Sequence, residues 1–271
     1  MLVGRRVQAF EIHDLERCPE FVRESVVESL GNALRWGRIY DPIAPVFERF
    51  CRDSGTTQIL DLCSGSGEPV GILLDALDRR GVPTPSFVLS DKFPNATRMG
   101  ELTRRYAGRI EAIGTSVDAT AVPQDIEHQA RTIISAFHHF PPALAAGILA
   151  DCVAQDKAVF VLEPFVRDVR RTALVSTMFT AATALNPVIT RRSRILKFAL
   201  TYWVPVLPIC AAWDAGISLL RMYSKTEFQD LVDAIEHDYD WQFEVIDIPL
   251  GGRISAFSGI PRKTGSHLAA S

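Results

Sequence analysis

A stretch of small residues that follows an apolar run is the part of this sequence best suited to bind a ligand. Ile59 to Leu62 would form a buried strand that carries Asp61 and then breaks into Cys63-Ser64-Gly65-Ser66-Gly67. If a helix begins there, its first backbone N–H groups are unpaired, and the small side chains let a ligand approach them closely. The pattern predicts a nucleotide-like ligand, although an ordinary glycine-containing turn would give the same pattern.

Further polar residues follow the other apolar runs. They are Asp91, Asp118, Ser135, His138, His139 and Glu163. Ligands of open parallel sheets bind beyond the carboxyl ends of the strands, so these side chains are expected to share one edge with Asp61. Neutral imidazole accepts a proton near pH 7, which makes the two histidines candidates for a general base; a structural role for the pair is the alternative.

The elements that must position these residues alternate between strands and helices. The sequence predicts strands at 86–90, 110–113, 132–136 and 158–162, with helices at 70–81 and 143–154. Nearly continuous apolar strands in this rhythm predict an α/β fold with a doubly wound, mostly parallel sheet and right-handed crossovers. A capping box formed by Ser224 and Glu227 predicts a helix to about residue 235, and two final strands, at 243–248 and 254–260, would close the sheet as an antiparallel pair.

The chain divides into five expected segments. They are an N-terminal helical cap at 1–54 with helices at 21–36 and 43–51, a ligand-binding core at 55–164, an apolar insertion at 165–221, a C-terminal helix and strand pair at 222–262, and a disordered tail at 263–271. Residues 198–213 are almost wholly apolar, but the run is shorter than a membrane span and contains Pro205 and Pro208. We therefore expect no stable membrane insertion; a buried helical insertion and a lid both fit the pattern.

Composition narrows the class of partner and the compartment. A formal charge of −3 over 271 residues, with scattered Lys and Arg, argues against nucleic acid as a partner. The five cysteines include no CxxC pair and no zinc-ligand spacing, so we expect no disulfide framework and no metal site. The same cysteine usage predicts that the protein is located in the reducing cytoplasm. The N-terminus lacks the apolar core of a secretory signal.

The order of these motifs resembles class I S-adenosylmethionine-dependent methyltransferases, in a bacterial branch of that family. The resemblance rests on the acid-and-glycine turn, the acid after the second strand, Asp118-Ala119 after the third, and the polar end of the fourth. It implies a seven-stranded Rossmann-like sheet of order 3-2-1-4-5-7-6 and S-adenosylmethionine as cofactor. The family usually has glycine where this chain has Cys63, and often cysteine where it has Ser64.

The resemblance also implies a role for each residue of the edge. The implied cofactor-binding set is Asp61, Cys63, Ser64, Gly65, Gly67, Asp91, Lys92, Asp118, Ala119 and Ser135. Asp91 would accept hydrogen bonds from both ribose hydroxyls, Asp118 would receive the adenine amine, and the glycines would pass under the methionine portion. Simpler roles for the two acids are a helix N-terminal residue and a loop cap, respectively.

The apolar insertion would supply a lid that excludes water, which favours a small, partly apolar acceptor, as in secondary metabolism. Candidate catalytic residues are His138, His139, Tyr202 and Asp214. Three alternatives remain open: aminocarboxypropyl transfer or cyclisation that releases methylthioadenosine, a non-catalytic binding or membrane-associated module, and a nicotinamide-dependent oxidoreductase, which would need a fuller GxGxxG turn. Whether the chain forms a homo-oligomer is also open.

Overall fold

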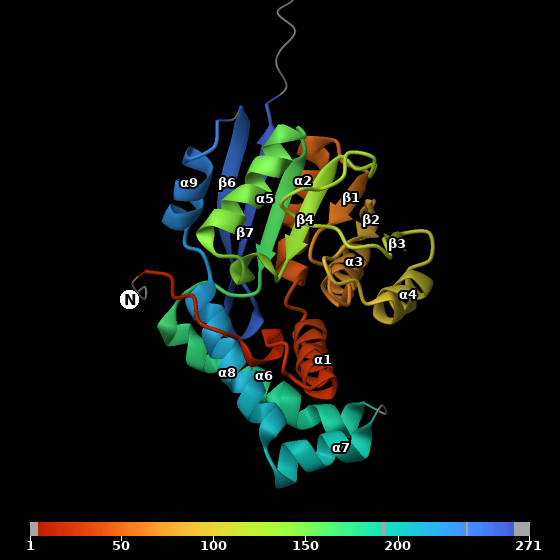
Figure 1. Cartoon of the computed structure of the whole chain (residues 1–271), viewed down its shortest axis with the longest axis vertical. Coiled ribbons are helices and arrows are strands. Elements are labelled where there is room, and N and C mark those ends of the chain that lie inside the picture. The colour runs from red at the N-terminus through yellow and green to blue at the C-terminus, as the bar shows by residue number, and fades with distance from the viewer. Residues whose placement is uncertain (1–4, 191–192, 237, 263–271) are drawn as a thin grey trace, which may run out of the picture.

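A seven-stranded sheet forms the centre of the computed structural model, which describes residues 5–190, 193–236 and 238–262 (Figure 1). Its strands are β1 (Gln58–Asp61), β2 (Ser86–Leu89), β3 (Ile110–Ala112), β4 (Ala130–Ile134), β5 (Ala158–Glu163), β6 (Tyr239–Asp247) and β7 (Arg253–Pro261). The order is β3-β2-β1-β4-β5-β7-β6. Strands β1 to β5 run parallel, and β7 lies antiparallel between β5 and β6. The predicted doubly wound sheet and its strand order are confirmed.

Nine α-helices lie among the described residues. They are α1 (Glu20–Trp36), α2 (Ala44–Ser54), α3 (Glu68–Arg80), α4 (Ala96–Arg105), α5 (Pro142–Ala154), α6 (Val169–Ile189), α7 (Arg194–Phe198), α8 (Val206–Arg221) and α9 (Lys225–Asp233). Short 3-10 turns are η1 (Ile12–Asp14), η2 (Asp41–Ile43), η3 (Phe137–His139) and η5 (Pro249–Gly251), and a π turn, η4 (Ala199–Trp203), joins α7 to the chain before α8. The expected tail at 263–271 lies outside the described residues.

Two apolar cores cover the two faces of the sheet, and neighbouring residues of one strand belong to different cores. Ile59 packs with α2, α3 and α4 on one face, whereas Leu60 packs with α5 and α9 on the other. This burial on both faces explains why the parallel strands have continuous apolar sequences rather than alternating ones. The capping box of α9 is present, since Glu227 N–H donates to Ser224 Oγ and Ser224 N–H donates to Glu227 Oε2.

The fourth strand begins and ends two residues earlier than predicted. It ends at Ile134 because Ser135 takes a left-handed backbone angle, φ 58°, and the chain then turns into η3. It begins at Ala130 although it contains Arg131, a fully buried charge that an apolar pattern does not predict. The guanidinium of Arg131 donates to Asp151 Oδ2 at 2.5 Å and to His128 Nε2 at 3.0 Å, so burial does not leave it unpaired.

The insertion after β5 forms a helical layer with α1 beyond the carboxyl ends of the strands (Figure 1). Cys18, Val22 and Val26 from the N-terminal segment and α1 pack against Leu207 and Cys210 of α8. Asn186 of α6 donates to Ser29 Oγ of α1 at 3.0 Å. Part of the expected N-terminal cap therefore belongs to the same layer as the insertion. Among the described residues, no one helix has the length and apolar composition to cross a membrane.

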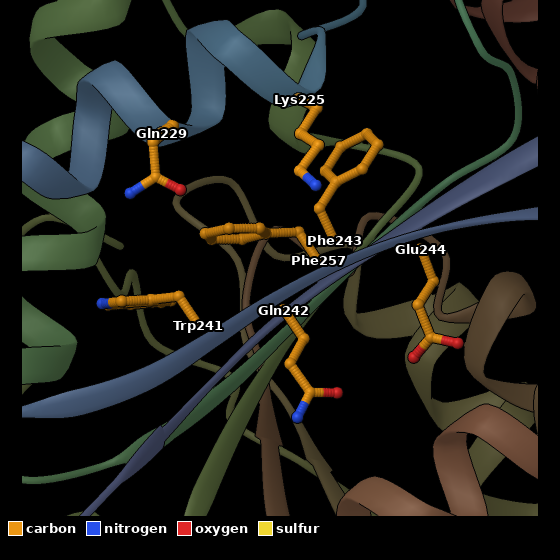
Figure 2. A pocket seen from close by; sticks show the side chains of 7 residues that line it. All are labelled: Lys225, Gln229, Trp241, Gln242, Phe243, Glu244 and Phe257. Atoms are coloured by element: carbon orange, nitrogen blue, oxygen red, sulfur yellow. The ribbon is translucent and has the colours of Figure 1, made fainter.

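A shallow hollow of about 380 Å³ lies at the other edge of the sheet, between α9 and the β6–β7 pair (Figure 2). Its walls include Lys225 and Gln229 of α9, Trp241 and Phe243 of β6, and Phe257 of β7. None of the residues in the predicted site lines this hollow.

Candidate functional site

In the turn after β1, every second residue from Cys63 to Gly67 has a positive φ. Cys63, Gly65 and Gly67 have φ of 58°, 54° and 72°. A Cβ at Gly67 would lie 2.6 Å from Leu89 and 2.7 Å from Leu102, so this glycine is required by packing at the start of α3. A Cβ at Gly65 would meet no atom within 4 Å, and Gly65 is exposed. The open side of Gly65 is where a ligand can approach the backbone.

Asp61, the last residue of β1, is hydrogen-bonded to this turn. Its carboxylate accepts hydrogen bonds from Ser64 Oγ at 2.6 Å and from Thr132 Oγ1 at 2.6 Å, and its side chain is buried. Burial raises the pKa of Asp61 to about 7, although the two hydroxyl groups act in the opposite direction. Asp61 and Ser64 therefore fix the shape of the turn, and Thr132 joins it to β4.

We expect Asp61→Asn to flatten the dependence of stability on pH between about pH 4 and 7. The pKa of Asp61 in the folded state lies above its unfolded value of about 4, so protonation of Asp61 stabilises the fold. This contribution to the free energy of unfolding is fully present below about pH 4 and is lost as the pH rises through 7, by up to about 1.4 kcal/mol per pH unit. Urea denaturation across this window measures the slope. Asp78→Asn, at an exposed acid of α3, should keep the wild-type slope; equal slopes for Asp61→Asn and the wild type would refute the assignment.

Asp91 lies at the end of β2 and faces the open side of the turn. Its Oδ2 accepts a hydrogen bond from Gly65 N–H at 2.8 Å and its Oδ1 accepts one from Phe93 N–H at 2.8 Å. A carboxylate oxygen can accept more than one hydrogen bond, so each retains an acceptor position for a ligand hydroxyl. The side chain is only partly buried, which leaves it accessible.

Lys92 and Asp118 form an exposed ion pair next to Asp91. Lys92 Nζ donates to Asp118 Oδ2 at 2.8 Å, and Asp118 Oδ1 accepts from Thr120 N–H at 2.9 Å and from its hydroxyl at 2.7 Å. The hydrogen bond from Lys92 holds the pKa of Asp118 well below its usual range. Asp118 thus caps its own loop, and Val117 N–H donates to the backbone of Asp91, which keeps the two loops together. Ala119 is buried beside them.

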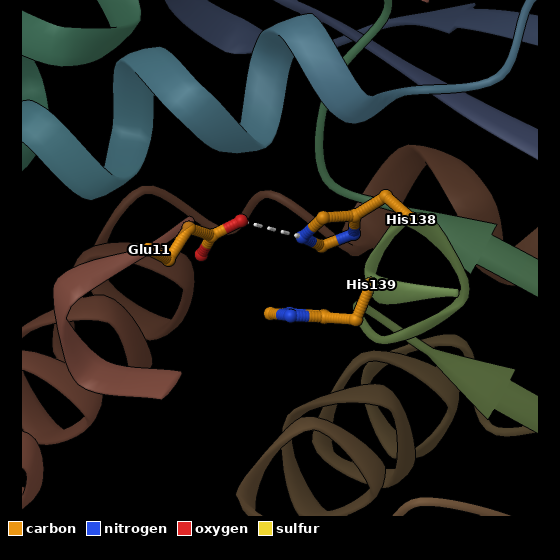
Figure 3. Close-up of side chains that lie close together, drawn as sticks. All are labelled: Glu11, His138 and His139. Atoms are coloured by element: carbon orange, nitrogen blue, oxygen red, sulfur yellow. Dashed lines mark ion pairs between the residues drawn. The ribbon is translucent and has the colours of Figure 1, made fainter. Parts of the chain in front are cut away.

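The end of β4 carries Ser135 and the two histidines. Ser135 Oγ lies 2.8 Å from the hydroxyl of Tyr40, which is fully buried. His138 is 3% exposed, and Glu163 at the end of β5 holds it at two points: Oε2 lies 2.7 Å from His138 Nδ1, and Oε1 accepts from His138 N–H at 2.8 Å. On its other side, His138 Nε2 lies 3.7 Å from Glu11 Oε1 (Figure 3).

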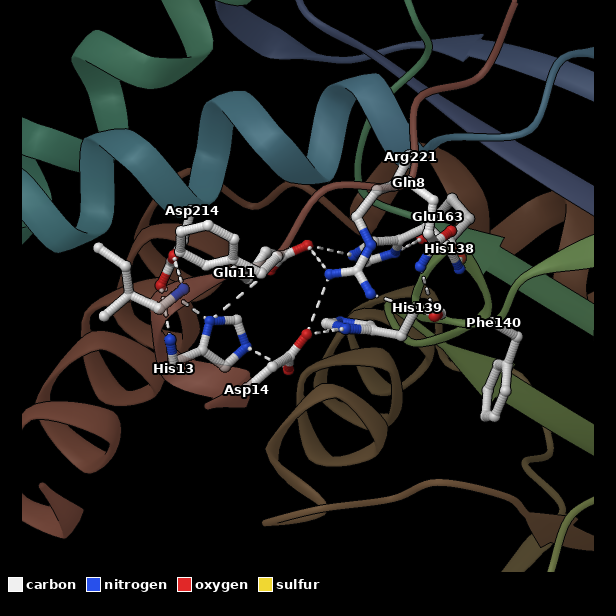
Figure 4. Close-up of polar contacts among 12 residues, drawn as sticks. Gln8, Glu11, His13, Asp14, His138, His139, Phe140, Glu163, Asp214 and Arg221 are labelled. Carbon is white, nitrogen blue, oxygen red and sulfur yellow. Dashed lines mark hydrogen bonds and ion pairs between the residues drawn. The ribbon is translucent and has the colours of Figure 1, made fainter. Parts of the chain in front are cut away.

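His139 lies beside His138 with the two rings tilted by 37° and 4.2 Å between their centroids, and its side chain is 25% exposed. Its Nδ1 lies 2.9 Å from Asp14 Oδ2 (Figure 4). Each histidine of the pair therefore has the carboxyl oxygen of an acidic side chain at Nδ1, which fixes the orientation of the ring.

Arg221, at the end of α8, binds the N-terminal segment to this histidine pair (Figure 4). Its Nη1 donates to Glu11 Oε1 at 2.8 Å and to Asp14 Oδ2 at 2.9 Å, and its Nη2 donates to the backbone oxygen of His139 at 3.1 Å. Glu11 is 1% exposed and Arg221 is 5% exposed. The pair is therefore a buried ion pair that connects three distant parts of the chain.

Asp214 lies about two turns before Arg221 on the same helix and binds the start of η1. Its Oδ1 accepts from Ile12 N–H at 2.5 Å, and its Oδ2 lies 2.9 Å from His13 Nδ1. Burial opposes protonation of His13, but its hydrogen bond to the carboxylate of Asp214 and the nearby acidic groups raise its pKa overall. Asp214 thus positions the N-terminal segment and has its oxygens occupied by it.

Burial controls the protonation of the two central histidines. It lowers the pKa of His138 to about 3, and it lowers the pKa of His139 as well, with the neighbouring His138 contributing. Burial raises the pKa of Glu163 to about 8. Both rings are therefore neutral at pH 7.

Glu11, His138 and His139 also offer metal-ligand atoms that all lie within 4.8 Å of one another. The guanidinium of Arg221 already supplies a positive charge to Glu11 and Asp14 in the same place. The absence of a metal stays a prediction from the sequence.

The structure brings most of the predicted residues to one edge. They follow the carboxyl ends of β1, β2, β3 and β4 in the chain, and the two histidines lie in η3 after β4; the set is the turn residues, Asp91, Lys92, Asp118, Ala119 and Ser135. Tyr202 is placed apart: it precedes α8, whose 16 residues, about 24 Å long, separate it from Arg221, and its hydroxyl donates to the backbone of Ala184 at 2.5 Å.

A buried helical insertion and a lid were both expected for the apolar run, and the structure has a helical insertion with several exposed side chains. Phe198, Trp203 and Ile209 are 46%, 81% and 61% exposed, so their side chains do not enclose a site. The segment that covers the histidines is instead the N-terminal one, from Arg6 to Asp14, where Arg6 Nη2 donates to the backbone oxygen of His138 at 2.6 Å. Glu11, Asp14 and Arg221 were not predicted to belong to the site. The seven-residue spacing of Asp214 and Arg221, which puts two charges on one face of an apolar helix, is the signal that could have found them.

No family model and no curated protein matches this sequence. Solved structures do match. The plantazolicin methyltransferase BpumL in complex with SAH is 9% identical, with a TM-score of 0.56 over 89% of this chain and 90% of that one. A putative O-methyltransferase from Nostoc punctiforme is 14% identical, with a TM-score of 0.51 over 94% of this chain and 64% of that one. An O-methyltransferase family protein from Burkholderia thailandensis is 13% identical, with a TM-score of 0.51 over 91% and 62%.

These similarities establish the fold. The chain has a Rossmann-like methyltransferase fold, with the seven-stranded order that the resemblance implied. Of the structures named here, BpumL is the one matched over nine-tenths of its own length.

Proposed function

We propose that this chain is an S-adenosylmethionine-dependent methyltransferase that acts on a small, partly apolar molecule. The observation that carries the proposal is the pairing of Gly65 with Asp91: an open glycine backbone whose N–H is held by an accessible carboxylate at the end of the next strand. In this fold, the carboxyl edge of the strands is where ligands bind. BpumL, which shares the fold, was solved with SAH.

The residues present fit this cofactor. Asp91 would accept the two ribose hydroxyls with its remaining acceptor positions, and the open side of Gly65 would lie under the methionine portion. Asp118 and Ala119 would border the adenine, while Ser135, Ser64, Cys63 and Lys92 would complete the surroundings. When bound, the cofactor supplies an electrophilic methyl group; the protein then has to bind, orient and exclude water.

His139 is our choice of general base for an acceptor that must lose a proton. Asp14 holds its Nδ1, its ring is only half-buried, and its lowered pKa keeps the ring neutral at pH 7. His138 is enclosed between Glu163 and Glu11 and would position the neighbouring ring.

The test is to incubate the protein with methyl-labelled S-adenosylmethionine and a metabolite extract, and to analyse both products by mass spectrometry. We expect a labelled small molecule together with adenosylhomocysteine. Release of methylthioadenosine in its place would contradict methyl transfer, and no labelled product from any extract would count against the enzyme itself.

With an acceptor from that screen, His139→Ala should reduce kcat by about 10² to 10⁴ while the Kd for S-adenosylmethionine stays unchanged. The control is His128→Ala. It removes the acceptor of a hydrogen bond from Arg131, at the end of β4 opposite to the histidine pair, and should keep the wild-type kcat. An unchanged kcat in the His139 variant would exclude it as the base.

A further inference from the structure

The far end of the helical insertion carries an unusual group of exposed apolar side chains. This apolar tip consists of Ile195, Leu196, Phe198, Tyr202, Trp203, Val204 and Ile209. Ile195 is 87% exposed and Trp203 is 81% exposed, and the tip lies at the end of the molecule farthest from the sheet, around α7 (Figure 1). Soluble surfaces rarely gather so much apolar area without a partner.

The segment of the sequence that carries the tip is basic. The sequence has no acidic residue between Asp168 and Asp214 and has six basic ones there, although acidic residues outnumber basic ones, 32 to 29, over the whole chain. Arg194 is exposed at the start of α7, next to Ile195, and its Nε donates only to a backbone oxygen, that of Pro187. Lys197 is buried, and Glu28 of α1 pairs with its ammonium group.

We propose that the apolar tip docks on the surface of an anionic lipid bilayer. Tryptophan and tyrosine side chains favour the boundary between headgroups and acyl chains, and aliphatic side chains beside them enter the acyl region. Arginine at the rim attracts anionic headgroups, and no acidic side chain of the segment repels them. A 75° bend separates α7–η4 from α8, so the turn between them presents the tip to a flat surface rather than across a bilayer.

A second copy of this chain fits the tip less well. A closed twofold interface brings the same patch of both copies together, so the exposed Arg194 of each copy would enter an interface in which the tip offers it no acidic partner. Headgroup phosphates and carboxylates neutralise the same charges. This inference rests on the tip alone and does not depend on the proposed methyl transfer.

Flotation of the full chain with extruded vesicles tests the proposal. We expect the chain to float with vesicles of phosphatidylcholine mixed with phosphatidylserine, less with phosphatidylcholine alone, and less as salt is raised. The double variant I195A/W203A should lose flotation, and Arg194→Gln should weaken it about fivefold. Trp36→Ala, at a half-exposed tryptophan of α1 outside the tip, should float like the wild type.

Brominated phosphatidylcholine in the same vesicles provides a second measurement, because bromine quenches a tryptophan that reaches the acyl region. Quenching should disappear in Trp203→Phe and persist in Trp36→Phe. Absence of wild-type flotation with anionic vesicles, or equal flotation of I195A/W203A with unchanged circular dichroism, would overturn the proposal. A wild-type dimer that this double variant dissociates, without vesicle binding, would overturn it in favour of a second copy.

Discussion

Asp91→Ala is expected to weaken S-adenosylmethionine binding by at least about 100-fold. The substitution removes the carboxylate that would accept both ribose hydroxyls, and hydrogen bonds to a charged group are each worth about 1.5 to 3 kcal/mol. It also removes the acceptor of Gly65 N–H, so the open turn loses the contact that holds it against β2. Isothermal titration calorimetry measures the change in Kd.

Two further variants separate charge from loop geometry. Asp91→Asn keeps an oxygen that can accept from Gly65 N–H but loses the charge and one acceptor, so its Kd should lie between those of the wild type and Asp91→Ala. Asp78→Ala removes an exposed acid of α3 that pairs with Arg109, and this variant should bind S-adenosylmethionine with the wild-type Kd. A Kd for Asp91→Ala within about threefold of the wild type would show that the ribose lies elsewhere, since threefold is below the loss of even one such bond.

Arg221→Met should lower the free energy of unfolding by about 3 to 5 kcal/mol, which is the typical cost of breaking a buried ion pair by removing one partner. The variant leaves Glu11, 1% exposed, without its cation and removes the link from α8 to Asp14 and to the backbone of His139. Urea denaturation monitored by circular dichroism measures the loss.

The matched control is Arg109→Met, which breaks a half-exposed pair with Asp78 and should cost about 1 kcal/mol or less. Adding Glu11→Gln to Arg221→Met should recover part of the loss, because the uncompensated buried charge is then absent. If Arg221→Met costs no more than Arg109→Met, the buried pair does not hold the N-terminal segment in place.

The sheet and the cofactor edge could be predicted because their signals are local. A buried parallel strand has a continuous apolar sequence, and a ligand-binding edge lies at its carboxyl end, so Asp61 and Asp91 were located from their neighbours alone. Ser135 shows the limit of this reasoning: its left-handed backbone ended β4 two residues early, which no apolar pattern records.

The contacts of the histidine pair could not be predicted in the same way. Glu11, Asp14 and Arg221 reach His138 and His139 from segments more than 80 residues away on one side and more than 120 on the other, and only tertiary packing brings them together. The apolar run at 198–213 posed a different problem. Periodicity reports that side chains are apolar but not what covers them, so a buried helical insertion and a lid were both expected where the structure has an exposed tip.

The most direct test of the account is a calorimetric titration of the wild-type protein with S-adenosylmethionine and, separately, with NAD. We predict saturable binding of S-adenosylmethionine at the turn that follows β1, with one ligand per chain, and no binding of NAD. The absence of S-adenosylmethionine binding to a folded sample, or tighter binding of NAD, would contradict the central claim that this edge of the sheet holds the methyl donor.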